Sequence, residues 1–333
     1  MRVSFIFRKA EDVRVMSIWI TVLLFLLGLA LIVKGGDWFL DGAVWIAEAT
    51  GVPRFIIGAT IVSLATTLPE LTVSVTGVLQ GEVDLAVGNA VGSVTANLGL
   101  ILGLSVVCIP SVVNRKQFDL KAILMVSGAL LLFVLCRGGA LPVRHSLLLF
   151  VVFAVYLGNN VMDARSGMAE SREANPKRRT VSHRQMFMKL CLFAAGIAAI
   201  VVGSRLLIDY GSELALLLGV PSSIIGVTMV AIGTSLPELV TTLAAIAKKE
   251  ASMSVGNIIG ANVIDLTMIL PVCSAVSGGQ LVIGSQTTAL DLPVCLGLCC
   301  LAVLPPLLRG KFYRWQGALM LAAYAAYVVA LVR

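Results

Sequence analysis

The stretch GVPRFIIGATIVSLATTLPELTVSV, residues 51–75, occurs a second time in altered form as GVPSSIIGVTMVAIGTSLPELVTTL, residues 219–243. The copies align without a gap at an offset of 219 − 51 = 168 residues. The same offset relates VGNAVGSVTANLGLILGL, from Val87, to VGNIIGANVIDLTMILPV, from Val255. Repetition over this length predicts that the chain consists of two homologous halves.

The composition is that of a membrane protein. Of the 333 residues, 58% are hydrophobic and 13% are charged, and the mean hydropathy of +0.98 lies outside the range of soluble proteins. About ten apolar segments reach helical length, at residues 17–50, 53–80, 84–109, 118–136, 142–162, 186–218, 222–248, 252–275, 286–307 and 313–332. The first and sixth are too long to cross a bilayer upright, so we expect them to be tilted or bent.

Each half holds about five spans, and an odd number means that the second half enters the membrane from the opposite side. The expected fold is therefore an all-α polytopic membrane protein with about ten transmembrane helices in two inverted five-helix repeats. We expect an N-terminal tail at residues 1–16, a first repeat at 17–162, a linker at 163–185 and a second repeat at 186–333.

Basic residues predict the orientation. The linker carries Arg165, Arg172, Lys177, Arg178, Arg179 and Arg184. If the spans alternate, the other connections on that side carry Arg54, Arg115, Lys116, Lys121, Lys248, Lys249, Arg309, Lys311 and Arg314. This excess predicts a cytoplasmic linker with both termini outside, although the basic N-terminal tail argues against that orientation. Topology also explains the net charge of +7, so we expect no nucleic-acid partner.

Enzyme chemistry is disfavoured. The only histidines, His145 and His183, lie in polar connections, and there is no GxSxG element. An intramembrane serine or cysteine hydrolase would need a general base, usually histidine, which these spans lack. We therefore expect neither catalysis nor a cofactor.

Both copies of the repeated stretch place a proline and a glutamate inside an apolar segment, as TTLPE (residues 66–70) and TSLPE (residues 234–238). Because proline donates no N–H and clashes with the carbonyl four residues earlier, each helix should break or kink there. Hydroxyl oxygens flank the break, at Thr66, Thr67, Thr234 and Ser235. Together with Glu70 and Glu238 they form an oxygen-only set that suits hard cations such as Ca²⁺ and Na⁺.

The second repeated element supplies further oxygen ligands. Ser93 and Asn97 lie four residues apart on one helix face, as do Ala261 and Asp265. We expect the side chains of Glu70, Glu238, Asn97 and Asp265 to converge near the middle of the bilayer. A proline or a hydroxyl alone more often has a structural role, but duplicated carboxylates inside a membrane are costly and favour a functional role.

Other intramembrane charges permit more than one interpretation. Residues on the two long segments could line the ion path or form paired or interfacial charges, namely Asp37, Asp41, Arg205 and Asp209. Asp119 and Asp291 stand near the starts of the fourth and ninth segments, where we expect them to cap helix N-termini.

The paired LPE elements, each followed by GN…G(S/A)…(N/D), resemble the repeats of the sodium/calcium exchangers in the cation/calcium antiporter superfamily, particularly the short prokaryotic antiporters. The resemblance covers essentially the whole chain. It implies that Glu70 and Glu238 bridge several ion sites and that Asn97 and Asp265 complete the cluster. It further implies backbone oxygens from Ser63, Thr66, Ala231 and Thr234 and hydroxyls from Ser93, Thr67 and Ser235. Ala261 replaces a serine that is common in the family, which removes one ligand from an outer sodium site.

The resemblance implies Ca²⁺ extrusion against Na⁺ entry by alternating access, with the long first and sixth segments moving against the rest. It implies a multi-pass protein of a prokaryotic inner (cell) membrane, with the lipid bilayer and the two ions as partners. A proton/calcium or potassium-dependent antiporter is the alternative within the superfamily. A passive cation channel would also use oxygen ligands and half-helices, but the inverted duplication around carboxylates favours a carrier.

Overall fold

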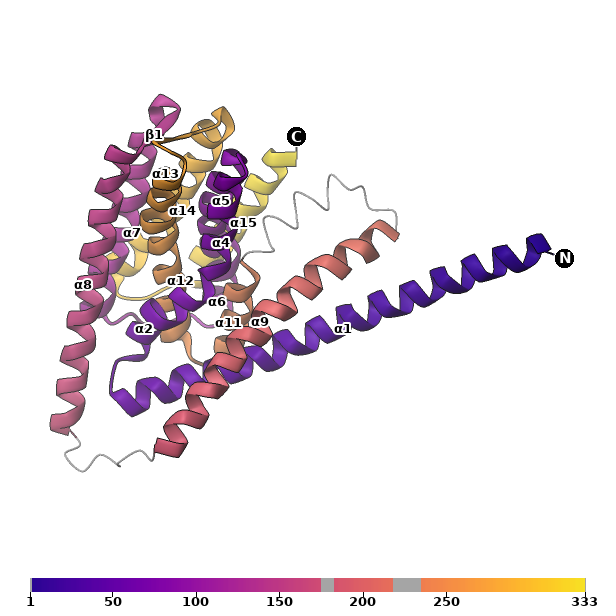
Figure 1. The fold of residues 1–333 in the computed structure, drawn as a ribbon. Coiled ribbons are helices and arrows are strands. Elements are labelled where there is room, and N and C mark those ends of the chain that lie inside the picture. Colours follow the sequence, from indigo (N-terminus) through magenta and orange to yellow (C-terminus); the bar gives the residue numbers. More distant parts are fainter. Residues whose placement is uncertain (1, 175–182, 218–234, 333) are drawn as a thin grey trace.

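The computed structural model describes residues 2–174, 183–217 and 235–332, which are almost entirely helical (Figure 1). The first half contains α1 (Arg2–Thr50), α2 (Arg54–Ile57), η1 (Gly58–Val62), α3 (Ser63–Thr66), α4 (Leu68–Leu79), α5 (Val83–Ala96), η2 (Asn97–Leu102), α6 (Gly103–Cys108), α7 (Arg115–Leu135), η3 (Cys136–Gly138) and α8 (Val143–Ala174). The second half contains α9 (His183–Leu217), α11 (Leu236–Ala247), α12 (Ala251–Ile264), η4 (Asp265–Ile269), α13 (Leu270–Val276), η5 (Thr287–Asp291), α14 (Leu292–Arg309) and α15 (Arg314–Val332).

Two short strands join the halves at one end of the bundle. β1 (Ala140–Pro142) pairs antiparallel with β2 (Gln280–Val282), and Leu141 lies opposite Leu281. Both leucines are fully buried. The strands therefore link the connection before α8 to the connection after α13.

Within the described ranges, seven helical stretches are long and apolar enough to cross a membrane, at Ile18–Thr50, Val83–Cys108, Arg115–Gly138, Val143–Ser171, Arg184–Gly211, Ala251–Val276 and Thr287–Arg309. The bent pair Arg54–Thr66 and Leu68–Leu79 makes an eighth. The shorter apolar helix α11 covers the described part of the seventh expected segment, and α15 covers the tenth. The prediction of a polytopic all-α protein is confirmed.

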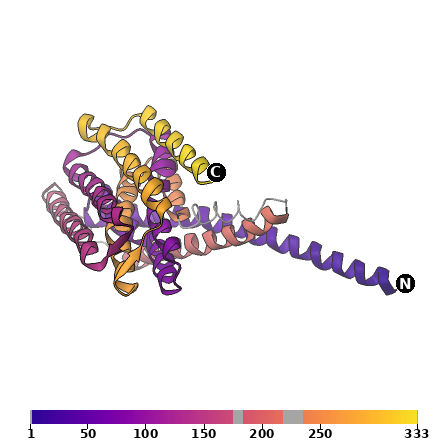
Figure 2. The same ribbon diagram turned by 90° about the horizontal axis from the view of Figure 1, so that it is seen from above.

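The two long helices α1 and α9 lie side by side and cross the remaining bundle obliquely (Figures 1 and 2). Glycines allow this close approach, because a Cβ atom on Gly35 would lie 2.9 Å from Ala199 Cβ and one on Gly203 would lie 2.8 Å from Gly28 O. Both helices are continuous, so the alternative of a bend is not observed, and the tilt relative to the bilayer stays a prediction. Residues 2–16, expected as a tail, continue α1 and project away from the bundle.

The centre of the molecule is formed by the spans Val83–Cys108 and Ala251–Val276. Of the most apolar window in each, 72% and 83% is buried, against 17% for Val143–Ser171. The second span packs tightly on the helix before α4: a Cβ on Gly256 would lie 2.2 Å from Phe55 O, and one on Gly260 would lie 2.6 Å from Ser63 Oγ. Glycine at these two positions is therefore required for the contact between the two halves.

Candidate ion-binding site

The helix break predicted at the first LPE element is present. α3 ends at Thr66, α4 begins at Leu68, and the two parts of the span are bent by 40°. Pro69 lies in the first turn of α4, where its missing N–H is harmless. Thr67 is the C-cap of α3, because its backbone N and its Oγ1 both donate to Ser63 O, at 2.9 and 2.8 Å.

The second LPE element has the same local geometry. Ser235 precedes α11 with φ −85° and ψ 5°, and Thr67 precedes α4 with φ −85° and ψ −1°. The amides of Leu239 and Leu71 donate to the carbonyls of Ser235 and Thr67, each at 3.0 Å. The backbone at the start of the two glutamate-bearing helices is therefore equivalent. The other two expected ligands of this half, Ala231 and Thr234, lie outside the described residues.

Asn97 and Asp265 each begin a π-helical turn. The turn η2 starts at Asn97 in the first half, and η4 starts at Asp265 in the second. A π turn inserts one extra residue into a helix and is frequent at functional sites. The segment η2 contacts α11, and η4 contacts α4, so each π turn meets the glutamate-bearing helix of the other half.

The four side chains expected at the centre are fully buried: Glu70, Glu238, Asn97 and Asp265 are each 0% exposed. None of the six carboxylate oxygens, nor Oδ1 of Asn97, accepts a hydrogen bond of ordinary length from the described residues, although the Thr66 hydroxyl lies near enough to Glu238 to interact with its carboxylate. The carboxylates nevertheless interact electrostatically, Glu70 with Glu238 and Asp265, and Asp265 with Glu238. Buried like charges without hydrogen-bond donors are strongly unfavourable unless cations or protons neutralise them.

Carboxylates alone do not complete a metal site here. Among the described residues, no three His, Cys, Asp or Glu side chains lie close enough together to hold a metal ion. The remaining ligands would have to be amide, hydroxyl or backbone oxygens, which Ca²⁺ and Na⁺ accept. Buried oxygens of this kind are present at Asn97, Ser93, Thr67 and Ser235, and Ser235 Oγ has no hydrogen-bond partner in the described part.

Two supporting asparagines were not predicted. Asn89 donates to Glu70 O at 3.1 Å and to Ser74 Oγ at 2.9 Å. Asn257 donates to Thr241 Oγ1 at 3.2 Å and accepts from Thr66 Oγ1 at 3.4 Å. They occupy equivalent positions, since 257 − 89 = 168, and Asn89 lies eight residues before Asn97 on the same helix face. The offset of the repeats was the signal that could have identified them.

The long helix α1 carries paired charges. Lys248 Nζ lies 2.7 Å from Asp41 Oδ1 and 3.4 Å from Asp37 Oδ1, so the interpretation as paired charges holds for both. Arg205 and Asp209 are exposed on α9.

The capping roles predicted for Asp119 and Asp291 are wrong. Asn114 caps α7 by accepting from the Lys116 amide at 3.2 Å, which leaves Asp119 in the second turn. Asp291 makes no side-chain capping bond and instead accepts from Tyr327 Oη at 2.9 Å.

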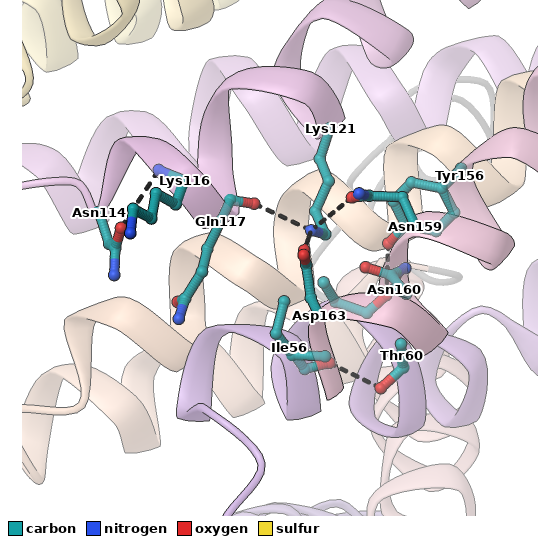
Figure 3. Close-up of polar contacts among 11 residues, drawn as sticks. Ile56, Thr60, Asn114, Lys116, Gln117, Lys121, Tyr156, Asn159, Asn160 and Asp163 are labelled. Atoms are coloured by element: carbon teal, nitrogen blue, oxygen red, sulfur yellow. Dashed lines mark hydrogen bonds and ion pairs between the residues drawn. The ribbon is translucent and has the colours of Figure 1, made fainter. Parts of the chain in front are cut away.

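Lys121, expected in a connection, is fully buried on α7. Its ammonium forms an ion pair with Asp163 and donates to Asn159 Oδ1 and Gln117 O, each at 3.0 Å (Figure 3). On the same face of α8, Tyr156 donates to the carbonyl of Ala59 in η1. The helix α8 is therefore anchored both to α7 and to the span that leads to Glu70.

Comparisons with known proteins agree with this architecture. The family described as sodium/calcium exchanger protein matches residues 20–162 and 188–333. The chain is 33% identical over 314 residues to an uncharacterized membrane protein of Methanocaldococcus jannaschii, covering 92% of this chain and 96% of that one. It is 28% identical over 350 residues to the sodium/calcium exchanger MaX1 of Methanosarcina acetivorans, covering 94% and 99%.

Solved structures give the same result. A structure of the sodium-calcium exchanger NCX_Mj soaked with zero Na⁺ and Ca²⁺ superposes with a TM-score of 0.81 at 30% identity, covering 94% of this chain and 99% of that one. The structure soaked with Na⁺ and Sr²⁺ gives a TM-score of 0.80 with the same coverage.

Proposed function

The chain belongs to the sodium/calcium exchanger family, and from that premise we propose that it exchanges Na⁺ for Ca²⁺ by alternating access, extruding Ca²⁺ as Na⁺ enters. The observation that carries the proposal is that the carboxylates of Glu70, Glu238 and Asp265 interact with one another while fully buried, with no hydrogen bond of ordinary length from the described residues.

The charge of this group explains why exchange is obligatory. Three carboxylates that repel one another in a low-dielectric interior need metal ions or protons to neutralise them at every stage of a transport cycle. Ca²⁺ and Na⁺ both prefer such oxygens, so we expect the two ions to compete for the same ligands and to replace each other. Three Na⁺ would balance the three carboxylates, whereas one Ca²⁺ leaves a single negative charge, which a proton can balance.

We assign the ligands by the correspondence of the two halves. Glu70 and Glu238 bridge the ions, and Asn97 and Asp265 complete the centre. Hydroxyl and backbone oxygens come from Ser63, Thr66, Thr67, Ser93, Ala231, Thr234 and Ser235. Ala261 offers no oxygen where the first half offers Ser93, so one sodium ligand is absent from that side of the site.

Alternating access requires a part that moves. The pair α1 and α9 is the candidate, because these helices pack mainly on each other through glycines and cross the rest of the bundle obliquely (Figure 1). In this scheme residues 17–162 and 186–333 are the two inverted repeats. The linker 163–185 lies in the cytoplasm and both termini lie outside a prokaryotic cell membrane.

The test is uptake of radiolabelled calcium into proteoliposomes loaded with sodium, potassium, choline or acidic buffer, one condition at a time. We expect saturating uptake only with an outward sodium gradient. Uptake into acid-loaded vesicles without sodium would show that protons, and not sodium, are the coupling ion. Uptake that requires potassium as well as sodium would indicate a potassium-dependent exchanger, and uptake under every condition would indicate a channel.

A further inference from the structure

A row of three buried side chains leads to the amide of Asn97. Asn97 Nδ2 donates to Asn262 Oδ1 at 3.1 Å, and Asn262 Nδ2 lies 3.8 Å from Met125 Sδ. Each of the three side chains is 0% exposed. They come from η2, α12 and α7, so the row joins both halves of the molecule. Neither Asn262 nor Met125 belongs to the ligand set proposed above.

The chemistry of the row determines which way each amide faces. A thioether sulfur accepts hydrogen bonds but cannot donate them. Asn262 therefore turns its NH₂ group toward Met125 and its oxygen toward Asn97. Asn97 must then direct its own NH₂ group at Asn262, which leaves its Oδ1 free, and this atom accepts no hydrogen bond from the described residues.

The orientation matters because an amide has two unlike ends. Its oxygen attracts a cation, whereas its NH₂ group carries only donor hydrogens and repels one. A carboxylate has no such wrong orientation, because its two oxygens are equivalent. An amide in a cation site therefore needs a partner that fixes it, and a carboxylate does not.

The two halves differ in this respect. The offset of 168 residues places Asp265 at the position of Asn97, and it places Val94 at the position of Asn262. The half that contributes a carboxylate thus has an apolar valine at the position equivalent to the orienting residue. The first half, which contributes the amide of Asn97, is contacted by Asn262 from the second half.

We propose that Asn262, itself oriented by Met125, is a positioning residue that turns the amide oxygen of Asn97 toward the transported Ca²⁺ or Na⁺. This inference rests on the proposed exchange function, since it assigns a role within the same site.

The first test replaces Asn262 by valine or by threonine, two residues that have the same shape as each other and differ in one hydroxyl group. Asn262→Val removes the acceptor, whereas Asn262→Thr keeps a hydroxyl oxygen. We expect Asn262→Val to raise the half-saturating calcium concentration, for equilibrium binding and for uptake, about fivefold, the value of one ordinary hydrogen bond. Asn262→Thr should lie closer to the unmodified protein, and Met125→Leu should raise the same concentration by less than Asn262→Val. Equal effects of valine and threonine would overturn the proposal.

The second test separates orientation from packing. In an Asn97→Asp background the side chain at position 97 has two equivalent oxygens, so Asn262→Val should no longer weaken calcium binding. The same fivefold weakening in both backgrounds would make Asn262 a packing residue and overturn the proposal. Sodium-driven uptake by the unmodified protein is measured alongside. Its absence would overturn the exchange function, whereas equilibrium calcium binding still decides the role of Asn262.

Discussion

Glu70 and Glu238 match each other in burial, in the backbone conformation at the start of their helices and in carboxylate oxygens that make no ordinary hydrogen bond to the described residues. One helix away the halves diverge: Asn97 corresponds to Asp265, and Ser93 corresponds to Ala261. The shared positions supply the charge that any cation requires. In the proposed ligand set, the divergent positions determine the total charge and the number of hydroxyl ligands, and we expect them to determine which cations are preferred and how many are bound.

The largest expected effect comes from removing a shared charge. Glu238→Gln should reduce sodium-driven calcium uptake to the vesicle background, and Glu70→Gln should do the same because the two positions are equivalent. Folding should survive, since a glutamine relieves the repulsion between buried carboxylates. Calcium uptake and thermal unfolding of the purified variants would measure both effects.

The matched control for this pair is Glu82→Gln, because Glu82 is exposed in the turn before α5. We expect its uptake to equal that of the unmodified protein. Retained transport in Glu238→Gln would remove that residue from the site. Retained transport in only one of the two variants would show that the halves are not equivalent at their glutamates.

The shared features could be predicted from the sequence, because local chemistry decides them. Proline at position 69 breaks or kinks the helix whatever packs around it. Carboxylates inside apolar segments indicate function. The π turns that begin at Asn97 and Asp265 could not be predicted in this way. A single inserted residue has no periodic signature, so only the structure reveals that both proposed ligands begin a π turn.

A second contrast concerns the anchoring of the halves. Aligning the Asp-Leu pairs at Asp119 and Asp291 places Pro293 opposite Lys121, so the second half has no equivalent of the lysine that pairs with Asp163. Its burial could not be predicted, because apolar periodicity does not identify a charged partner on another helix. A lysine near a segment end is more often an interfacial residue.

Lys121→Met should therefore destabilise the protein without altering ion preference. Removing the ammonium leaves the partly buried carboxylate of Asp163 unpaired, which costs about 3 kcal/mol. The measurement is thermal unfolding in detergent, together with the sodium and calcium dependence of the remaining uptake.

The control for this variant is Lys116→Met, on the same helix but exposed, which should leave the unfolding temperature unchanged. The double variant Lys121→Met with Asp163→Leu should recover most of the loss, because neither charge is then left unpaired. If the double variant were as unstable as Lys121→Met alone, the ion pair would not be the cause.

The smallest expected effect concerns the hydroxyl that the second half lacks. Ala261→Ser makes this position match Ser93, and we expect it to lower the sodium concentration that half-saturates exchange by about fivefold, as one added oxygen ligand of about 1 kcal/mol would. Ser93→Ala removes the hydroxyl from the first half, so that both halves have alanine at this position, and it should raise that sodium concentration by a similar factor.

Ala261 is fully buried, so a serine at this position that did not bind sodium would instead lower stability slightly and leave the sodium dependence unchanged. Shifts of opposite sign in the two variants would show that the unequal hydroxyls of the two halves set sodium preference. Shifts of the same sign would mean that packing at these positions, and not their oxygen atoms, governs exchange.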